Sequence, residues 1–404
     1  MDTIQHFLSG LKPLFDPRTQ WHHLQSMDYR LNTVLILLTT MMVAFITMAV
    51  LANYTSIGAN TTEKVKEALP IPKPGAPPIP PPTEVTSLRI YPIKSCRGIE
   101  ITSTRLKKTG LTLDRNWMFI SKDDRKFMTI RQEASMTLID TAIKEDPSSP
   151  GKDQKLEISI HGTDARVLVP AFPTKEWLDK NTKLGTVEIW GQETDAYEYG
   201  DEINKIFEDF FNKPVALVYK GPTDRMVGVN GKKELYGKEV PHHFADVMSL
   251  QVASEASIKD LNRRLGLKED APQDLAIERF RPNIIVRGRD DHPWEEDTWK
   301  RIRVTTTLHD EQAIYKLDLD AVARCARCQV PNVDPDTADK HAKEPWDELM
   351  KFRRVDTGDV AKWKPCFGML CIPRNEGKIR VGATLEVLET TDKHLFNTRK
   401  FSEL

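Results

Sequence analysis

The stretch Arg324-Cys325-Ala326-Arg327-Cys328, followed by the turn Val333-Asp334-Pro335-Asp336-Thr337, organises this sequence. The run before it, 313–319, has strand-like composition, and the turn after it is rich in proline and aspartate. The two thiols therefore lie where a strand ends and a loop begins. Two arginines are interleaved with them, and cationic neighbours lower the pKa of a thiol and favour the thiolate. Such a pair suits a metal ion, a disulfide or a nucleophile, and the remaining sequence must distinguish these.

Length and composition narrow the classes of protein to consider. The chain has 404 residues, of which 39% are apolar, enough for two or three domains with buried cores. Its formal net charge of −1 argues against bulk attraction to nucleic acid, so no nucleic-acid partner is expected. The five cysteines are an odd, sparse set that is not typical of a disulfide framework. We therefore expect the folded part to lie in a reducing compartment.

One segment has the composition of a membrane anchor. Residues 31–62 contain no Asp, Glu, Lys or Arg, and 34–52 is almost wholly apolar. About 20 such residues cross the hydrocarbon core of a bilayer, and the segment lies too far along the chain for a signal peptide. A buried core helix is the alternative, but no face of the segment carries a polar stripe. The sequence predicts a single transmembrane helix at 31–54, with membrane lipid as a partner.

The orientation of this anchor cannot be read from charge, because basic residues flank both of its ends. Sequons for N-glycosylation begin at Asn53 and Asn60, and they would be used if that side were luminal. The free thiols further along favour the cytosol instead. We expect the folded part to face the cytosol.

The rest of the chain predicts a mainly β fold of class α+β. The proline-rich run 69–82 predicts a semi-rigid polyproline II spacer, with a ligand for an SH3-like partner as the alternative. Short β-like runs separated by turn signals then recur, as at 117–121 and 127–131, which is typical of a small barrel or sandwich. The predicted organisation is an N-terminal segment 1–30, a transmembrane anchor 31–54, a proline-rich linker 55–84, a β-barrel-like domain 85–215, a second β-barrel domain 216–391 and a C-terminal tail 392–404.

Three further elements can be placed from spacing and capping residues. Apolar residues at helical spacing predict a helix over 201–211. Ser254 is a favourable N-cap for a helix that follows it. The run 280–287 predicts a strand in which Arg281 and Asn283 alternate and therefore share one face.

Several polar residues stand within these β-like surroundings, namely Lys94, Ser95, Asp114, Arg115, Arg281 and Asn283. Taken singly, each is explained by a solvated turn charge or by a hydrogen bond to a neighbouring strand. Cys325 and Cys328 fit a redox pair. With Cys366 and Cys371 they would also supply four thiolates for a zinc ion.

Five motifs, taken together and in order, resemble those of a known family. Three of them are Ile-Tyr-Pro-Ile-Lys-Ser-Cys-Arg-Gly at 90–98, Leu-Asp-Arg-Asn-Trp-Met at 113–118 and Thr-Ile-Arg-Gln at 129–132. The others are Phe-Arg-Pro-Asn-Ile-Ile-Val at 280–286 and the thiol motif with its turn at 325–337. This set is similar to the MOSC N-terminal β-barrel domain and the MOSC β-barrel domain of the mitochondrial amidoxime-reducing components, which are molybdenum enzymes. The resemblance does not extend to the anchor or the linker.

The resemblance implies roles for nine residues. It makes Cys328 the thiolate ligand of molybdenum and the protein's contribution to the catalytic centre. The positions that it implies for the molybdopterin part of the molybdenum cofactor are Lys94, Ser95, Arg115, Asp246, Arg281, Asn283, Ala326 and Arg327. Thiolates are soft ligands that suit a metal already held by sulfur, and lysine and arginine suit a phosphate group.

The chain departs from the family pattern at several positions. Ala338 replaces the glycine that follows the Asp-Pro-Asp-Thr turn, which calls the geometry of that turn into question. Val247 and Met248 replace small polar residues beside Asp246, so contacts there are expected to be lost or to involve only the backbone. Cys325 is expected to be structural.

The activity implied by the resemblance is reduction of small N-hydroxylated compounds, such as amidoximes and hydroxylamines. The implied electron donors are cytochrome b5 reductase and cytochrome b5, and the sequence contains no Gly-x-Gly-x-x-Gly pattern of its own for a dinucleotide. The implied location is the mitochondrial outer membrane, with the endoplasmic reticulum as the alternative. A molybdenum cofactor sulfurtransferase and a non-catalytic molybdopterin carrier are the competing functions.

Overall fold

The computed structural model describes residues 41–42, 75–145, 153–227, 233, 237, 239–308, 311–358 and 361–394. The chain divides into two compact units, 1–69 and 70–404. In the first unit the described residues are Met41 and Met42, an exposed piece of helix. The predicted segment 1–30, nearly all of the anchor and most of the linker lie outside the described residues, as does the tail from 395. Among the residues that are described, no helix has the length and apolar character needed to cross a bilayer.

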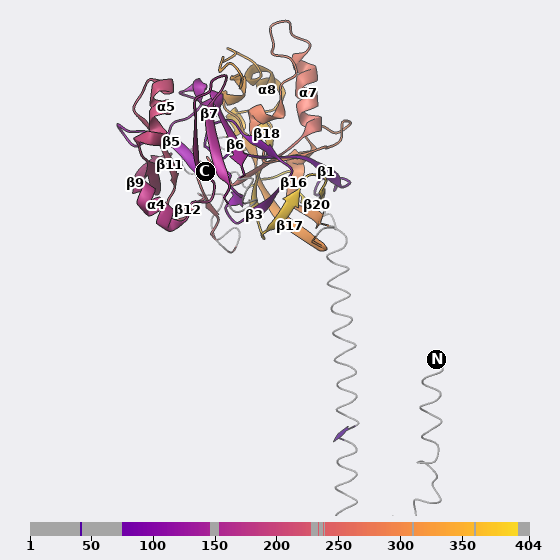
Figure 1. The fold of residues 1–404 in the computed structure, drawn as a ribbon. Helices are drawn as coiled ribbons and strands as arrows, with labels where there is room; N and C mark the ends of the chain where they lie inside the picture. Colours follow the sequence, from indigo (N-terminus) through magenta and orange to yellow (C-terminus); the bar gives the residue numbers. More distant parts are fainter. Residues whose placement is uncertain are drawn as a thin grey trace, which may run out of the picture. The chain divides into compact units, whose positions relative to one another are not determined.

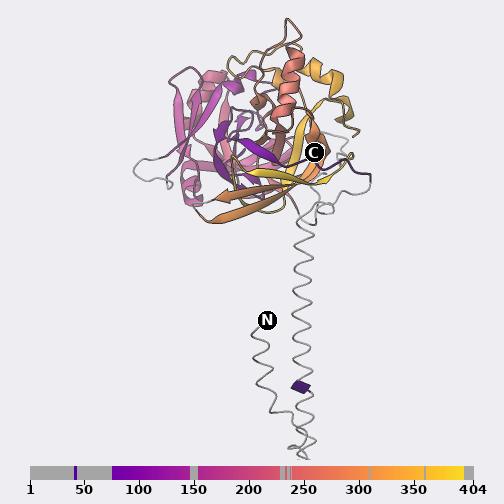
Figure 2. The ribbon, with the colours of Figure 1, turned by 90° about the vertical axis from the view of Figure 1, so that its right-hand side faces the viewer.

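A closed β-barrel of seven strands forms the main body of the second unit (Figures 1 and 2). Its strands, in order around the barrel, are β15 (Ile284–Val286), β14 (Leu250–Ser254), β18 (Cys366–Pro373), β17 (Ala313–Ala326), β16 (Trp299–Leu308), β20 (Thr384–Thr390) and β1 (Thr83–Ile90). The barrel closes because β1 also pairs with β15. Only the β14–β15 pair is parallel among these pairings. The strand β2 (Ile99–Ile101) extends the sheet beyond β1.

Burial along the strands follows from their sequences. In β18, the apolar run Cys-Phe-Gly-Met-Leu-Cys-Ile-Pro is buried at all eight positions, as expected of a strand covered on both faces. In β16, buried residues alternate with more exposed ones, so one face packs on the core. The pairing of β17 with β18 shifts register between Arg324 and Ala326. Such a bulge re-aims side chains at the end of a strand, and here it lies at the thiol motif.

A second sheet lies beside the barrel, and α-helices flank it on the left of Figure 1. Its strands are β5 (Trp117–Ser121), β11 (Val215–Lys220), β10 (Gln192–Tyr199) and β9 (Thr182–Ile189), and its helices are α4 (Lys175–Asn181) and α5 (Asp201–Phe211). The bounds of α5 confirm the helix predicted over 201–211. Phe207 of α5 packs against Phe119 of β5, with ring centroids 4.9 Å apart.

Smaller sheets and short helices complete the unit. The remaining strands are β3 (Ser103–Lys107), β4 (Gly110–Leu111), β6 (Ile139–Lys144), β7 (Lys155–Ile160), β8 (Arg166–Pro170), β12 (Arg225–Met226), β13 (Pro241–His242) and β19 (Gly377–Arg380). The remaining helices are α7 (Glu255–Leu265), α8 (Trp346–Phe352) and the 3-10 turns η2 (Ala134–Leu138), η4 (Ile277–Phe280), η5 (Glu295–Thr298), η6 (Val330–Asn332) and η7 (Ala361–Trp363). Ser254 caps α7 by accepting a hydrogen bond from Ser257 N, which confirms that prediction. The described part of the chain is therefore mainly β, as predicted.

The two predicted globular domains share strands. The strand β1, from the segment 85–215, closes the barrel built by the segment 216–391. In return β11, at the start of the later segment, pairs with β5 and β10 of the earlier one. One hydrophobic core contains Phe119 and Phe207 together with Ile302 and Leu385. Residues far apart in sequence are thereby brought together in one folded unit.

One predicted strand is wrong, and a second is shorter than predicted. The run 127–131 makes only an isolated bridge between Ile120 and Phe127 and otherwise forms a loop. The run 280–287 begins with the end of η4 and an Arg281 in left-handed conformation, φ 59°, so the strand is confined to β15. A left-handed residue interrupts the pleat, so Arg281 and Asn283 are not related by strand alternation. Apolar composition indicated extended structure in both runs, but tertiary contacts decide these short segments.

Candidate functional site

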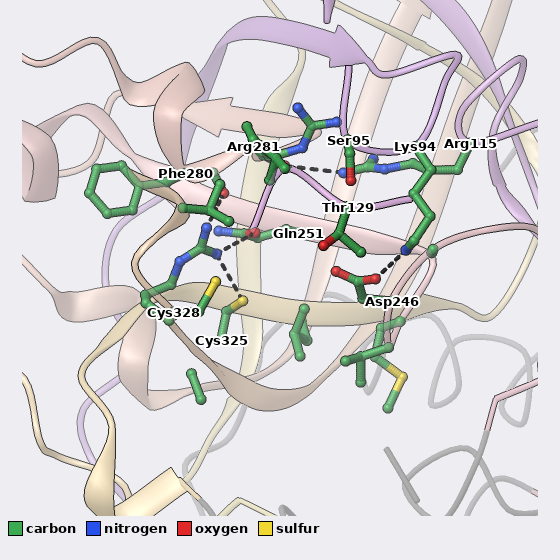
Figure 3. Close-up of a pocket in the computed structure, with 18 of the residues that line it drawn as sticks. Lys94, Ser95, Arg115, Thr129, Asp246, Gln251, Phe280, Arg281, Cys325 and Cys328 are labelled. Carbon is green, nitrogen blue, oxygen red and sulfur yellow. Dashed lines mark hydrogen bonds and ion pairs between the residues drawn. The ribbon is translucent and has the colours of Figure 1, made fainter. Parts of the chain in front are cut away.

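A cavity of about 400 Å³ brings all nine predicted site residues together (Figure 3). These residues are Lys94, Ser95, Arg115, Asp246, Arg281, Asn283, Ala326, Arg327 and Cys328. They come from the loops after β1 and before β5, from the segments before β14 and β15, and from the end of β17. The strand exchange between the two predicted domains is what places these segments side by side.

The thiol end of the cavity, defined by Cys325, Cys328, Arg131 and Arg327, lies where β17 ends. Arg327 is buried and donates hydrogen bonds to Gln251 Oε1 (3.1 Å), Cys325 Sγ (3.0 Å) and the Phe280 carbonyl (2.9 Å). These bonds fix the loop that carries Cys328. All five cysteines of the described residues are free thiols.

The two thiols have different surroundings. Burial raises the pKa of Cys325, although the neighbouring Arg327 acts in the opposite direction. The expectation that interleaved arginines lower the pKa of both thiols is therefore wrong for Cys325, because desolvation outweighs the guanidinium. Cys328 instead accepts a hydrogen bond from Arg131 Nε at 3.4 Å. Cys328 is thus the thiol that faces a cationic donor from another segment.

A second group of lining residues, the Tyr91 end, consists of Arg115 and Arg281, which both contact the buried Tyr91. Both guanidinium groups lie over the Tyr91 ring, 4.5 Å from its centroid for Arg115 and 4.2 Å for Arg281. Arg115 also contacts Asp114 Oδ2 at 2.5 Å, whereas Arg281 donates to the carbonyl of Cys96 at 2.6 Å. Burial and the nearby Arg115 lower the pKa of Arg281 to about 10. Within the described ranges no carboxylate forms an ion pair with Arg281.

Three of the site residues have left-handed backbones, namely Ser95 (φ 68°), Arg115 (φ 51°) and Arg281 (φ 59°). Such conformations cost a non-glycine residue about 1–2 kcal/mol. They persist where surrounding contacts over-determine the backbone, as at ligand-binding sites. Ala338 also has a left-handed backbone (φ 62°), so the turn keeps the geometry that a glycine would adopt without strain.

Asn283 is almost fully buried, and its side chain holds neighbouring residues of the cavity in place. It is 1% exposed, and its amide nitrogen donates to the Arg89 carbonyl and to Asp114 Oδ1, both at 3.1 Å. Its amide oxygen accepts hydrogen bonds from Arg115 and from the Gln251 backbone, both at 3.2 Å. The side-chain amide is therefore fully used within the protein, and Asn283 acts by positioning Arg115.

Lys94 and Asp246 form an ion pair within the cavity. Lys94 is 4% exposed and also donates to the Phe244 carbonyl at 3.0 Å. Burial lowers the pKa of Lys94 to about 8, against the opposing effect of Asp246. Asp246 accepts a further hydrogen bond from Trp190 Nε1 at 2.9 Å. Burial tends to raise the pKa of Asp246, but Lys94 and Arg131 outweigh it and hold the pKa well below its usual value.

The lining of the cavity carries an excess of positive charge. Six cationic side chains line it, namely Lys94, Arg115, Arg131, Arg281, Arg327 and Lys364. Asp246 is the one carboxylate in the same lining. In addition, Nε of Arg327 is buried without a hydrogen-bond partner. This charge distribution suits an anionic ligand with several hydrogen-bond acceptors.

Sequence reasoning missed the roles of Arg131, Trp190 and Gln251. Arg131 belongs to the motif Thr-Ile-Arg-Gln at 129–132, but only the folded chain shows that it contacts Cys328 and Asp246 from a different segment. Gln251 reaches Arg327 because Gly368, with φ 73°, leaves room where a Cβ would lie 2.9 Å from Gln251 Nε2. Nothing in the local sequence indicates that approach.

The zinc alternative required the four later cysteines to gather. Cys366 and Cys371 are instead buried within β18. Within the part of the chain that the structure describes, no group of three or more His, Cys, Asp or Glu side chains is placed to hold a metal ion. A four-thiolate zinc site is therefore not formed by these residues.

Comparison with known families identifies the class of protein. The model of the MOSC N-terminal beta barrel domain matches residues 83–214, and the model of the MOSC domain matches residues 239–386. The chain thus has the architecture of proteins that join these two domains.

Individual relatives then define the family. Mitochondrial amidoxime reducing component 2 of Rattus norvegicus is 30% identical over 308 residues, which cover 74% of this chain and 81% of the relative. Mitochondrial amidoxime-reducing component 1 of Homo sapiens is 29% identical, covering 75% and 82% respectively. The chain belongs to the MOSC-domain family that includes the mitochondrial amidoxime-reducing components. Molybdenum cofactor sulfurase of Oryza sativa subsp. japonica is 28% identical over 74% of this chain, but the match spans 34% of that relative.

Proposed function

We propose that this chain is a molybdenum-dependent reductase of N-hydroxylated compounds such as amidoximes and hydroxylamines. In this proposal the cavity holds a molybdenum–molybdopterin cofactor. The observation that carries the proposal is the lining itself, which combines six cationic side chains, one carboxylate and two free thiols. An anionic cofactor with a terminal phosphate and a metal that favours sulfur ligands fits this donor set.

The residues of the two ends have separate tasks. At the thiol end, Cys328 would ligate the metal, while Arg131 and Arg327 fix the thiol and its loop. At the Tyr91 end, Arg115 and Arg281 would hold the phosphate, with Ser95 beside them. Lys94 and Asp246 form a paired donor and acceptor in the same lining, and Asn283 positions Arg115.

When bound, the cofactor supplies the two-electron redox chemistry of the reaction. An amidoxime, two electrons and two protons give an amidine and water, so the N–O bond breaks and the oxygen leaves as water. The protein would hold the thiol ligand and surround the reacting group with fixed charge. Such preorganised charge is a large contribution to catalysis.

The proposal extends to electron supply and location. We propose cytochrome b5 and cytochrome b5 reductase as donors, and a single-pass anchor at 31–54 in the mitochondrial outer membrane with the folded part facing the cytosol. The names of the mitochondrial relatives support this location, and the apolar composition of 34–52 supports the anchor. The endoplasmic reticulum is the alternative membrane. A glycosidase-sensitive glycan on Asn53 or Asn60 would show that the orientation is reversed.

The alternative function is transfer of sulfur to the cofactor, which the rice sulfurase match favours. A reconstituted assay separates the two functions. Purified full-length protein is combined with NADH, cytochrome b5 reductase and cytochrome b5, and amidine formation from an amidoxime is followed. We expect turnover that depends on all three components. Molybdenum-containing protein that shows no turnover would contradict the reductase function.

A further inference from the structure

A second cavity, of about 540 Å³, adjoins the first. Three residues line both cavities, namely Thr129, Arg131 and Trp190. None of the nine predicted cofactor-site residues lines the second one. The two spaces are therefore separate in their residues but share a wall.

On the side of Cys328, this shared wall is formed by the side chain of Arg131. Arg131 donates to Cys328 Sγ at 3.4 Å and lies 3.6 Å from Asp246 Oδ2, while its guanidinium stacks 4.8 Å from the centroid of Trp190. Trp190 in turn donates to Asp246 at 2.9 Å. A molecule in the second cavity would be one side chain away from the proposed metal ligand.

The lining of the second cavity combines aromatic rings with charged side chains of both signs. Phe127 and Trp190 pack edge to face with centroids 4.7 Å apart, and buried Met128 and Val215 add apolar surface. Of the three carboxylates in this lining, Asp124 pairs with Lys126 and Glu133 pairs with Lys213, whereas the exposed Asp123 has no ion pair among the described residues. Aromatic rings favour offset or edge-to-face packing with another ring, and a carboxylate favours a protonated or N–H-rich group.

We propose that the second cavity binds the organic substrate, an N-hydroxylated amidine that carries an aromatic ring. The ring would pack against Phe127 and Trp190, and the N–O group would face Arg131 and the thiol end of the first cavity. The inference rests on the proposed reductase function for the chemistry, and on the shared wall for the location. It makes Phe127 and Trp190 determinants of specificity for aryl substrates over small ones.

Filling the second cavity tests this location. Pro214 is exposed, lines the cavity and offers no side-chain hydrogen bond, so Pro214→Trp adds volume without removing a polar contact. Pro222→Trp is the matched control, because Pro222 is also exposed and lines neither cavity. Binding of benzamidoxime to the full-length protein is measured by calorimetry. Turnover of benzamidoxime and of hydroxylamine is measured alongside.

We expect Pro214→Trp to weaken benzamidoxime binding and raise its KM at least tenfold. Hydroxylamine turnover and molybdenum content should stay at the wild-type level, and Pro222→Trp should change none of these quantities. Equal benzamidoxime affinity in the wild type and Pro214→Trp would overturn the location, as would a wild type that binds no benzamidoxime. Failure of the reductase function would appear differently, as absent turnover with binding still sensitive to Pro214→Trp.

Discussion

The two ends of the first cavity hold their positive charges in different ways. At the thiol end, Arg131 lies 3.6 Å from the carboxylate of Asp246 and donates to Cys328. At the Tyr91 end, Arg115 pairs with Asp114, whereas Arg281 has a carbonyl and an aromatic ring as its neighbours, and no carboxylate pairs with it among the described residues. Burial and Arg115 also lower the pKa of Arg281 to about 10, so its charge is costly there without a ligand.

This difference indicates how an asymmetric anionic cofactor would be oriented. A buried cation without a counter-ion is stabilised by a ligand that brings negative charge, so the Tyr91 end suits the phosphate. The thiol end suits the metal because it holds Cys328, and coordination depends on the thiolate rather than on net charge. Substitutions at each end should therefore have separable effects, turnover at the thiol end and retention at the Tyr91 end.

The largest effect is expected at the thiol end. Cys328→Ser replaces a soft thiolate by a hydroxyl, and turnover should fall by more than about 100-fold, because loss of even an outer-shell partner costs 10–100-fold at metal sites. Cys325→Ser should change turnover only a few-fold, since a cysteine that is not reactive behaves as a small apolar side chain. Turnover and bound molybdenum are measured for each variant, with circular dichroism to check folding. Equal losses from both variants would indicate a redox disulfide instead.

At the Tyr91 end, Arg281→Ala should weaken retention of the cofactor. Hydrogen bonds to charged groups contribute about 1.5–3 kcal/mol, which corresponds to roughly 10- to 100-fold in affinity. Pterin content after gel filtration is the measurement. Arg287→Ala is the control, because Arg287 is exposed and pairs with Glu84 on the surface. Wild-type pterin content in Arg281→Ala would remove the Tyr91 end from the site.

Lys94, which also lines the cavity, predicts that retention of the cofactor depends on pH. Its pKa is lowered to about 8 by burial, with Asp246 opposing. Below this pH the ammonium is charged and available to an anion; above it, binding must take up a proton, so affinity falls by up to about tenfold per pH unit. Retention of pterin should therefore be lower at about pH 9 than at about pH 7. Lys94→Met should be weaker at both values and lose the pH dependence, and an unchanged pH profile in this variant would assign the titration elsewhere.

The smallest effect concerns the turn that follows the thiol motif. Ala338→Gly should increase the free energy of unfolding by about 0.5–1 kcal/mol, because glycine adopts its left-handed backbone without the alanine penalty. Ala276, exposed and with φ −70°, offers the control. Ala276→Gly should lose about 0.4–1 kcal/mol through the unfolded state. Urea unfolding measures both, and a loss in Ala338→Gly would mean that the turn relaxes to another conformation.

The sequence predicted which residues line this cavity, but it did not predict how they are arranged. Motif order placed Lys94, Arg115, Arg281 and Cys328 in one site, and the cavity contains all four. The helices at 201–211 and after Ser254 followed from local spacing and capping, which act within a few residues.

What sequence reasoning missed depends on contacts between distant segments. The left-handed backbones of Arg115 and Arg281 cannot be read from residue type, because arginine has no preference for that region. The exchange of β1 and β11 between the two predicted domains also follows from pairings far apart in sequence. Arg131 was placed on a strand, yet the loop that it occupies is what brings it to Cys328.

Metal and pterin analysis of the purified wild-type protein tests the central claim most directly. The claim is that the cationic cavity holds a molybdenum–molybdopterin cofactor through Cys328. It predicts molybdenum and pterin in equal amounts, approaching one of each per chain, with molybdenum lost or altered in Cys328→Ser and pterin lost in Arg281→Ala. Protein that carries zinc, or neither metal nor pterin after expression in a host that makes the cofactor, would contradict it.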